Sequence, residues 1–213
     1  MFEGSIAATP LALLARVIAL LVAISVHEYA HALVADRLGD ATAREAGRLT
    51  LNPLKHLSLW GALFLFLFRF GWSKPVPVNA YNFRNPRQGT LLVSLAGPLA
   101  NFLTAAVFAI LMRLVPGGTH LPILVQEIVI LNLVLMIFNL FPIPPLDGSS
   151  ILPFVFDRRG QLLYALERQG FLLLFGLIVF DALSGGRILG LLIGVPVFTL
   201  ANLLLGSGAF LPS

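Results

Sequence analysis

The sequence contains no cysteine in its 213 residues. Disulfide bonds, thiolate zinc sites and cysteine nucleophiles are therefore excluded, and a bound metal would need nitrogen or oxygen ligands. Charged residues are also scarce: they make up 11% of the chain and hydrophobic residues 58%, whereas a typical soluble domain carries about 25% charged residues. This composition excludes a water-soluble globular protein and predicts an integral membrane protein.

The small excess of positive charge, +4, does not indicate nucleic-acid binding. Most basic residues lie in loops between apolar runs, and basic loops of membrane proteins stay on the cytoplasmic side. We therefore expect the lipid bilayer as the environment of this chain, and no nucleic-acid partner.

Five apolar runs are each long enough for a membrane-spanning helix. They are Leu11–Ala35, Gly89–Leu114, Leu121–Phe141, Gln161–Ala182 and Arg187–Leu205. A sixth run, Leu57–Phe68, is too short to span comfortably, and a re-entrant segment is the natural alternative where protein surrounds it. We predict an all-α membrane protein with about five transmembrane helices and a re-entrant hairpin between the first and second.

The basic residues provide a test of this topology. They follow the first long run, the short run and the third long run: Arg37, Arg44, Arg48 and Lys55; Arg69, Lys74, Arg84 and Arg87; Arg158 and Arg159. If the short run returns to the face that it left, all three basic loops lie on one face, which is expected to be cytoplasmic. If the short run crosses the membrane, the basic loops divide between both faces.

The first long run contains His27-Glu28-Tyr29-Ala30-His31, an H-E-x-x-H motif. On a helix, residues i and i+4 lie on one face, so His27 and His31 can both reach one metal ion. Glu28 can then act as general base toward water and as proton donor to the leaving amine. The motif alone is a weak signal, but ionisable groups inside an apolar span are costly and usually functional. The alternative is a polar patch hydrogen-bonded to neighbouring helices.

A catalytic zinc site needs a third protein ligand and one open position for water. Val34 and Arg37 stand where a metzincin has its glycine and third histidine, so that extension is absent. Asp147 is the candidate, because the prolines of Pro142–Pro145 should break the helix before it, and an unwound segment at membrane depth can line a cavity. The alternative for Asp147 is a simple Asp-Gly turn after a helix.

Two other patterns have structural interpretations. Asp36, Asp40 and Glu45 lie among arginines in a basic loop, where solvated ion pairs are expected. Three glycines recur at a four-residue spacing within 186–194, which is typical of a close-packed helix face inside the monomer.

With the H-E-x-x-H motif and Leu146-Asp147-Gly148 both in apolar surroundings, the chain resembles the site-2 protease family of intramembrane zinc metalloproteases, in a compact form without a PDZ or CBS domain. Three further segments resemble motifs of that family: N-P-x-x-H at Asn52–His56, G-W-x-K-P-V-P-V-N at Gly71–Asn79, and S-x-A-G-P-x-x-N at Ser94–Asn101. Ser58 departs from the pattern, because many relatives carry Asp there.

The resemblance implies one zinc ion per chain, bound by His27, His31 and Asp147, with Glu28 as the catalytic carboxylate. It also implies a β-like form for the re-entrant hairpin, around Asn52–Asn79, which would present the substrate in an extended conformation.

The resemblance further implies that Asn101 and Asn139 lie near the site, with Asn139 contacting the substrate backbone and Asn101 positioning water or an oxyanion. From the residues alone, Asn101 has an equal alternative as a polar bridge between helices. His56 is either a transition-state or outer-shell donor or an interfacial histidine, and we favour the second interpretation.

We expect one integral membrane protease domain over residues 1–213, with a family-like core near 11–152 and additional helices near 161–206. The expected substrates are single-pass membrane proteins, cut within or near their transmembrane segments. The expected location is a prokaryotic inner membrane, with the site toward the cytoplasm. The alternatives are a zinc or proton transporter and an inactive scaffold that binds membrane helices. The sequence leaves the substrate and the oligomeric state open.

Overall fold

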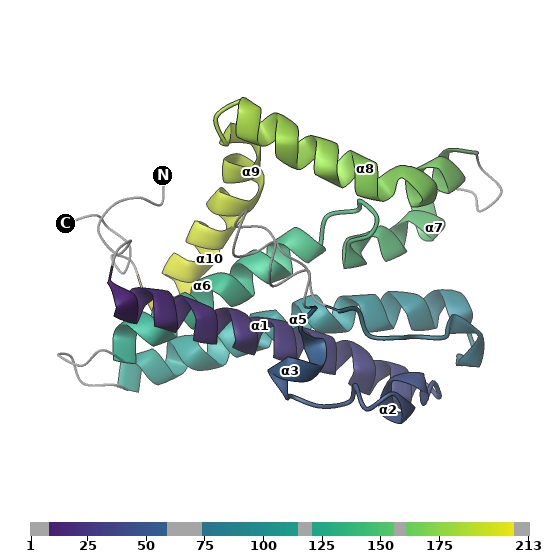
Figure 1. The fold of residues 1–213 in the computed structure, drawn as a ribbon, viewed down its shortest axis with the longest axis horizontal. Coiled ribbons are helices and arrows are strands. Elements are labelled where there is room, and N and C mark those ends of the chain that lie inside the picture. The colour runs from purple at the N-terminus through teal and green to yellow at the C-terminus, as the bar shows by residue number, and fades with distance from the viewer. Residues whose placement is uncertain (1–8, 59–73, 115–120, 156–160, 207–213) are drawn as a thin grey trace.

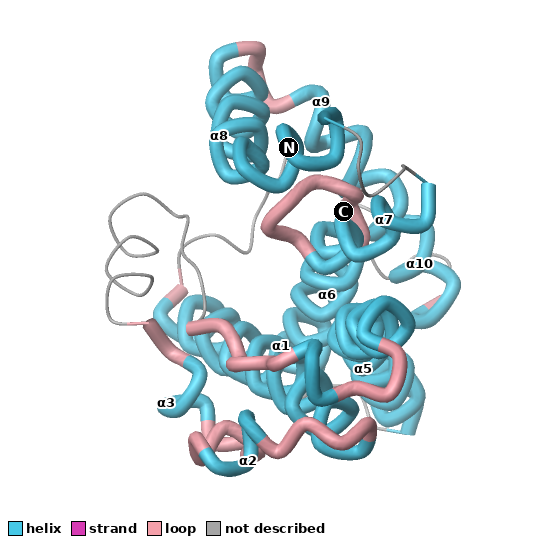
Figure 2. The backbone as a smooth tube through the Cα atoms, turned by 90° about the vertical axis from the view of Figure 1, so that its right-hand side faces the viewer, coloured by secondary structure: helices cyan, strands magenta, loops and turns pink. Residues whose placement is uncertain are grey.

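A computed structural model describes residues 9–58, 74–114, 121–155 and 161–206. Within these ranges the chain forms helices and no strand. Three helices form the centre of the fold: α1 (Pro10–Arg37), α5 (Pro86–Leu114) and α6 (Leu121–Asn139). Figures 1 and 2 show α1 and α5 running alongside each other, with α6 packed across both. The expectation of a helical protein is confirmed.

Helix α1 presents one face of small residues to its neighbours. Its N-terminus is capped by Thr9, whose hydroxyl accepts a hydrogen bond from the Ala12 amide over 3.2 Å. Buried alanines then recur every three or four residues, at positions 12, 15, 19 and 23, and His27 and His31 continue the same face. Small side chains let helix backbones approach closely. The sequence therefore places both histidines against α5 and α6.

Helix α5 has a matching buried face with a four-residue spacing. Gly89, Val93, Gly97, Asn101 and Ala105 are all buried, and Ala109 continues the series. The C-terminal part of this face, at Ala105 and Ala109, packs against α6 and α10 (Val195–Leu205). The cluster includes Val129, Leu133 and Val197 of those helices. This apolar cluster fixes the relative positions of α5 and α6 on one side of the polar residues described below.

The remaining elements are shorter or lie toward the C-terminus. They are α2 (Thr42–Glu45), α3 (Pro53–His56), the 3₁₀ turns η1 (Ala80–Asn82) and η2 (Asp147–Ile151), α7 (Leu152–Val155), α8 (Gln161–Leu183) and α9 (Arg187–Leu189). A π-helical stretch, Gly190–Gly194, joins α9 to α10. Figure 2 shows α8 standing apart from the central helices.

All five runs predicted to span the membrane are helical over most of their length. Among the described residues, three helices are long and apolar enough to cross a membrane: Pro10–Arg37, Pro86–Leu114 and Arg187–Leu205. The described, apolar part of α6, Ile123–Asn139, is shorter. Five spans therefore remain a prediction, in which α6 and α8 are the two additional segments.

The glycines of 186–194 do not form the close-packed face that we expected. A methyl group added at Gly190 or Gly194 would meet no atom of the described residues within 4 Å, and Gly186 lies in a turn with φ of +71°. Close approach occurs elsewhere: at Gly170 of α8 an added methyl would come within 2.4 Å of Pro144. The spacing of glycines in the sequence was therefore a poor guide to which helix faces touch.

The short run predicted as a hairpin lies largely in 59–73, outside the described residues. The described residues that flank 59–73 nevertheless lie side by side, because the Lys74 amide donates a hydrogen bond to the His56 carbonyl over 2.8 Å. The Arg48 guanidinium also donates to the Lys74 carbonyl. The chain therefore returns after residue 73 to the place it left, which places the basic loops on either side of this segment at one end of the molecule.

Asp40 does not form the solvated ion pair that we expected. Its side chain is fully buried, and its carboxylate accepts hydrogen bonds from the Asn79 amide (2.7 Å), the Asn82 side chain (2.7 Å) and Thr42. Although burial alone would raise the pKa of this carboxyl, the bonds from Thr42, Asn79 and Asn82 outweigh it and lower the pKa below its usual value. Asp40 thus holds the segment before α5 against the end of α1.

This arrangement predicts an acid-sensitive contribution to stability. Because the pKa of Asp40 is lower in the folded than in the unfolded chain, its stabilisation is complete above the unfolded pKa, about 3.9. It is lost as the pH falls through the folded value. We expect Asp40→Asn to have a lower melting temperature than wild type in detergent at pH 7. This difference in melting temperature should become smaller as the pH approaches 3. An unchanged difference across this pH range would remove Asp40 as the acid-sensitive group.

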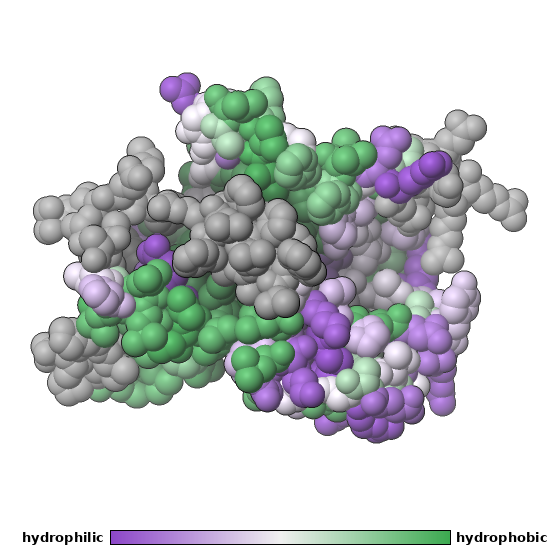
Figure 3. Space-filling model, viewed as in Figure 1, coloured by the Kyte–Doolittle hydropathy of each residue, from purple (hydrophilic) through white to green (hydrophobic). Residues whose placement is uncertain are grey.

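Hydrophobic and hydrophilic residues divide along the length of the central helices. Figure 3 shows apolar residues covering the half of the molecule nearer the start of α1, whereas hydrophilic residues gather at the other end, around α2 and α3. The exposed apolar residues of α1 include Leu13 and Leu14, and those of α5 include Ile110 and Leu114. This distribution fits helices that enter a bilayer from the end that carries the basic loops.

Candidate metal centre

His27 and His31 lie one turn apart on the buried face of α1. They are 5% and 8% exposed, and their Nε2 atoms are 3.0 Å from each other. The two rings meet edge to face, with centroids 4.5 Å apart. The helix therefore aims both imidazoles at the same point.

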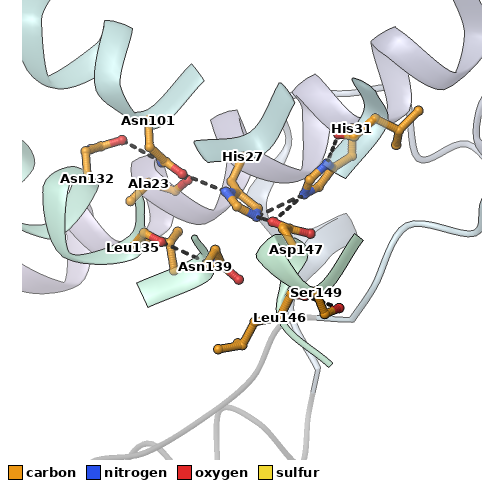
Figure 4. A network of polar contacts seen from close by, with 11 residues as sticks. Ala23, His27, His31, Asn101, Asn132, Leu135, Asn139, Leu146, Asp147 and Ser149 are labelled. Atoms are coloured by element: carbon orange, nitrogen blue, oxygen red, sulfur yellow. Dashed lines mark hydrogen bonds and ion pairs between the residues drawn. The ribbon is translucent and has the colours of Figure 1, made fainter. Parts of the chain in front are cut away.

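Asp147 reaches this point from a separate part of the chain. Helix α6 ends at Asn139, and the chain then turns back through the proline-rich segment so that η2 begins at Asp147. Its Oδ2 atom lies 3.0 Å from His27 Nε2 and 3.3 Å from His31 Nε2. Figure 4 shows the three side chains converging. The structure thus brings together the three residues selected from the sequence, with ligand atoms within 4.8 Å of one another.

The turn that delivers Asp147 requires a glycine at the next position. A methyl group added at Gly148 would lie 2.2 Å from the Leu140 carbonyl oxygen, a distance that no Cβ can occupy. The Leu-Asp-Gly sequence is therefore more than a generic turn, because Gly148 lets the chain fold tightly against the end of α6.

The other nitrogen of each imidazole is held by an oxygen. His31 Nδ1 lies 2.7 Å from the Val93 carbonyl, which can only accept a hydrogen bond. His27 Nδ1 lies 2.6 Å from Asn101 Oδ1. In a neutral imidazole the proton therefore resides on Nδ1, and each Nε2 directs a lone pair toward Asp147.

Asn101 is itself fixed by an asparagine that our sequence analysis missed. Its amide donates to the Ala23 carbonyl (2.9 Å) and to Asn132 Oδ1 (2.8 Å), so its oxygen must face His27. The Asn132 amide in turn donates to the Ile128 carbonyl over 2.8 Å. Both asparagines are fully buried. A polar residue in the middle of an apolar helix was the signal that could have identified Asn132.

These bonds leave three electron-pair donors facing one another. Two Nε2 lone pairs and a carboxylate oxygen meet at about 3 Å, and Asp147 Oδ2 is buried without a hydrogen-bond donor among the described residues. Such a cluster is repulsive unless a proton or a cation lies within it. Zinc with ligands at 2.0–2.1 Å in a tetrahedral arrangement would separate the ligand atoms by about 3.3 Å. The donor set and its spacing therefore fit a zinc ion.

Gly97 provides the space for this cluster on α5. A methyl group at Gly97 would lie 2.5 Å from His31 Nε2 and 2.6 Å from His27 Cε1. The backbone of α5 thus forms one wall of the centre, directly against both rings. In the sequence, Gly97 had no distinguishing feature beyond its place in the family-like segment.

Glu28 lies beside the first histidine and inside the protein. The residue is 6% exposed and directly follows His27 on α1. A carboxylate in this position is close to the cluster without belonging to it, as the general base of an H-E-x-x-H site should be.

Asn139 and His56 are not joined to the cluster by any hydrogen bond among the described residues. Asn139 is the last residue of α6, and its amide donates to the Leu135 carbonyl over 3.0 Å. His56 is fully buried, and its Nε2 bonds to the Thr50 carbonyl over 2.7 Å. His56 is thus packed into the loop that carries α3, and its placement at the membrane interface stays a prediction.

We expect the asparagine pair to control metal affinity through His27. Replacing Asn101 with Leu removes the acceptor for His27 Nδ1–H, and loss of such a partner typically weakens metal binding by about 10- to 100-fold. Asn132→Leu leaves Asn101 in place but removes Asn132 Oδ1, which accepts a hydrogen bond from the Asn101 amide. We therefore expect a smaller loss of metal affinity. Competition between the purified protein and a chelator measures both affinities. Equal affinity of wild type and Asn101→Leu would contradict the assignment.

Taken together, the fold and this cluster define a class of protein: a helical membrane protein with a candidate metal centre of two buried histidines and one partly buried carboxylate, next to a buried glutamate. Comparison with known proteins identifies relatives of the same kind. The chain is 43% identical over 145 residues to "Putative zinc metalloprotease YwhC" of Bacillus subtilis, covering 64% of this chain and 66% of that protein. It is 32% identical over 172 residues to "Putative zinc metalloprotease Rip2" of Mycolicibacterium smegmatis, covering 77% and 66%.

The Rip2 protein of Mycobacterium tuberculosis H37Rv is also similar, with 34% identity over 171 residues, 76% of this chain and 64% of that protein. The chain belongs to the site-2 protease family, as the ordered motifs indicated. It spans just under two thirds of the length of these relatives. No family model matches the chain, and no solved structure matches it.

Proposed function

We propose that this protein is a zinc-dependent endopeptidase that cuts the transmembrane segments of single-pass membrane proteins. The observation that carries the proposal is the meeting of His27, His31 and Asp147 inside the membrane-type helices, with no donor for Asp147 Oδ2 among the described residues. The names of the relatives support a zinc metalloprotease, and the position of the cluster between α1, α5 and α6 supports a substrate that lies within the membrane.

The residues of the chain divide the chemistry between them. His27, His31 and Asp147 would hold a zinc ion, which when bound polarises the scissile carbonyl and makes water more acidic. Glu28 takes a proton from the attacking water and delivers it to the leaving amine. Asn101 keeps the Nδ1 proton of His27 in place, so that Nε2 remains available as a ligand.

A membrane-spanning substrate must unwind locally before it can be cut, because a helix uses its own carbonyls in hydrogen bonds. We propose that the cut lies toward the cytoplasmic side of a bacterial inner membrane. The support is the position of the basic loops: the segments on both sides of 59–73 meet at Lys74, near the end of α1 that follows the histidines.

Purified protein should cut single-span substrates in a zinc-dependent way. A panel of such substrates, reconstituted with the protein and analysed by mass spectrometry, should give products whose new ends lie within or beside the hydrophobic segment. A chelator should stop the reaction and added zinc should restore it. Cleavage only in soluble loops, or cleavage that survives complete removal of metal, would contradict the proposal.

A transporter of zinc or protons is the second candidate, because the same three ligands could serve as a transit site. The two candidates differ at Glu28. Transport should tolerate Glu28→Gln as long as metal still binds, whereas hydrolysis needs the carboxylate. An inactive scaffold is disfavoured by the presence of Glu28 beside a complete set of ligands.

A further inference from the structure

An open cavity with both polar and apolar lining lies beside the candidate metal centre, and Arg87, in the first turn of α5, is part of its lining. It has a volume of about 320 Å³, and its lining includes Asp147 together with Arg87, Thr90, Ser94, Ser149 and Ser150. Pro144, Pro145 and Leu146 form part of its wall. This volume falls at the lower end of the range of ligand pockets, about 300–1,000 Å³. The cavity therefore has room for a few side chains of an extended peptide next to the proposed reaction centre.

Helix α5 connects this cavity to the histidines. Arg87, Thr90 and Ser94 line the cavity at spacings of three and four residues, and Gly97, which touches both rings, follows on the same face. With a rise of 1.5 Å per residue, Arg87 is about 15 Å along the helix from Gly97. An extended peptide covers 3.3–3.6 Å per residue, so about four or five residues bridge that distance.

Arg87 is held in place without a carboxylate partner among the described residues. Its guanidinium carbon lies 3.9 Å from the centre of the Phe154 ring, and one terminal nitrogen donates to the Pro153 carbonyl. Within the described part of the chain, its buried Nε atom has no hydrogen-bond partner, and neither has the buried Ser150 hydroxyl. Two donors in the lining of one cavity thus lack an acceptor, although a buried donor of this kind is costly to leave unpaired.

We propose that Arg87 and Ser150 form a subsite that binds an acidic side chain of the substrate, a few residues from the peptide bond that is cut. A carboxylate is the ligand that suits a fixed guanidinium and a neighbouring hydroxyl. The inference rests on the proposed function, and it adds a preference for substrates with Asp or Glu on the side of the cut nearer the basic loops. The carboxylate created by cleavage would lie at the candidate metal centre itself, about four or five residues away from Arg87.

The test compares matched substrates. One single-span substrate carries Glu, Gln or Lys in turn at each of the positions flanking the cut, and kcat/KM is measured for wild type, Arg87→Gln and Arg87→Glu. At one position, about four or five residues from the cut, wild type should prefer Glu to Gln by roughly 10-fold or more. Arg87→Gln should bring this ratio close to unity, and Arg87→Glu should favour Lys instead.

Arg84→Gln provides a matched control, because Arg84 is exposed and does not line the cavity. It should keep the wild-type ratio of Glu to Gln. Metal content per chain shows whether each variant is folded. If Arg87→Gln is unstable, Arg87→Lys takes its place; it keeps the charge and should retain part of the preference for Glu over Gln. A wild-type ratio near unity at every position, or a preference that survives in Arg87→Gln, would overturn the subsite.

A binding experiment separates failure of the subsite from failure of the proposed function. The uncut substrates are titrated against Glu28→Gln protein in detergent, where the Glu form should bind more tightly than the Gln form and Arg87→Gln should abolish the difference. If wild type cuts no substrate but this difference is present, the subsite stands and the protease proposal fails. If the substrates bind equally, the subsite fails, whether or not wild type cuts them. If the difference persists in Arg87→Gln, the preference belongs to another residue.

Discussion

Replacing Glu28 with Gln should reduce cleavage of a single-span substrate by about 1,000-fold or more while leaving the metal in place. Glutamine has nearly the same shape, but its amide cannot take a proton from water, and proton transfer by a positioned group contributes typically 10²–10⁴-fold. Glu28 is adjacent to His27 on the chain and is buried beside His31, so its removal should affect kcat and leave KM nearly unchanged.

The control for this substitution is Glu45→Gln, an exposed glutamate of α2 at the basic end of the molecule. It should cut at the wild-type rate. Metal content measured on the same samples separates a chemical defect from loss of the ion. Wild-type cleavage by Glu28→Gln would exclude Glu28 as the general base, and transport of zinc by this variant at the wild-type rate would favour the transporter.

Asp147→Ala is expected to weaken zinc binding by more than about 100-fold, beyond the 10- to 100-fold typical of losing an outer hydrogen-bond partner. Among the residues that the structure describes, this carboxylate is the one contributor to the cluster from outside α1, and its Oδ2 atom lies within 3.3 Å of both imidazole nitrogens. Without it, only the two imidazoles from one turn of α1 remain, whereas a catalytic zinc site needs three protein ligands. Cleavage should be lost together with the metal.

Asp36→Ala serves as the comparison for Asp147. Asp36 pairs with Arg44 over 3.3 Å at the surface, and such exposed pairs contribute about 0–1 kcal/mol. Asp36→Ala should therefore bind zinc and cut substrate as wild type does. If Asp147→Ala binds zinc as tightly as Asp36→Ala does, the third ligand lies elsewhere in the chain.

The sequence was informative where chemistry and periodicity agree. The four-residue spacing of His27 and His31 is enough to place both rings on one side of α1, and the prolines before Asp147 do end α6 and turn the chain back. The topology argument, in which the short run returns to its starting face, agrees with the hydrogen bond between Lys74 and His56. The positions of the long helices followed from the apolar runs, whereas the short helices α2 and α3 did not.

The sequence was less informative about contacts between distant segments. Asn132 fixes Asn101 only because two helices bring residues 31 positions apart into contact. Gly97 matters because of its distance from two rings on another helix, whereas Gly190 and Gly194, which formed the more regular pattern, face open space. Asp40 appeared to be a surface acid because its neighbours in the sequence are basic, but its partners come from 79–82.

The central claim is that two imidazoles of α1 and the carboxylate of Asp147 hold one metal ion. X-ray absorption at the zinc edge, on protein loaded with one zinc per chain, tests it most directly. The account predicts nitrogen and oxygen neighbours at about 2.0–2.1 Å with two imidazole rings in the scattering pattern, and loss of one imidazole contribution in His31→Ala. A spectrum with a single imidazole, or one that is unchanged in His31→Ala, would contradict it.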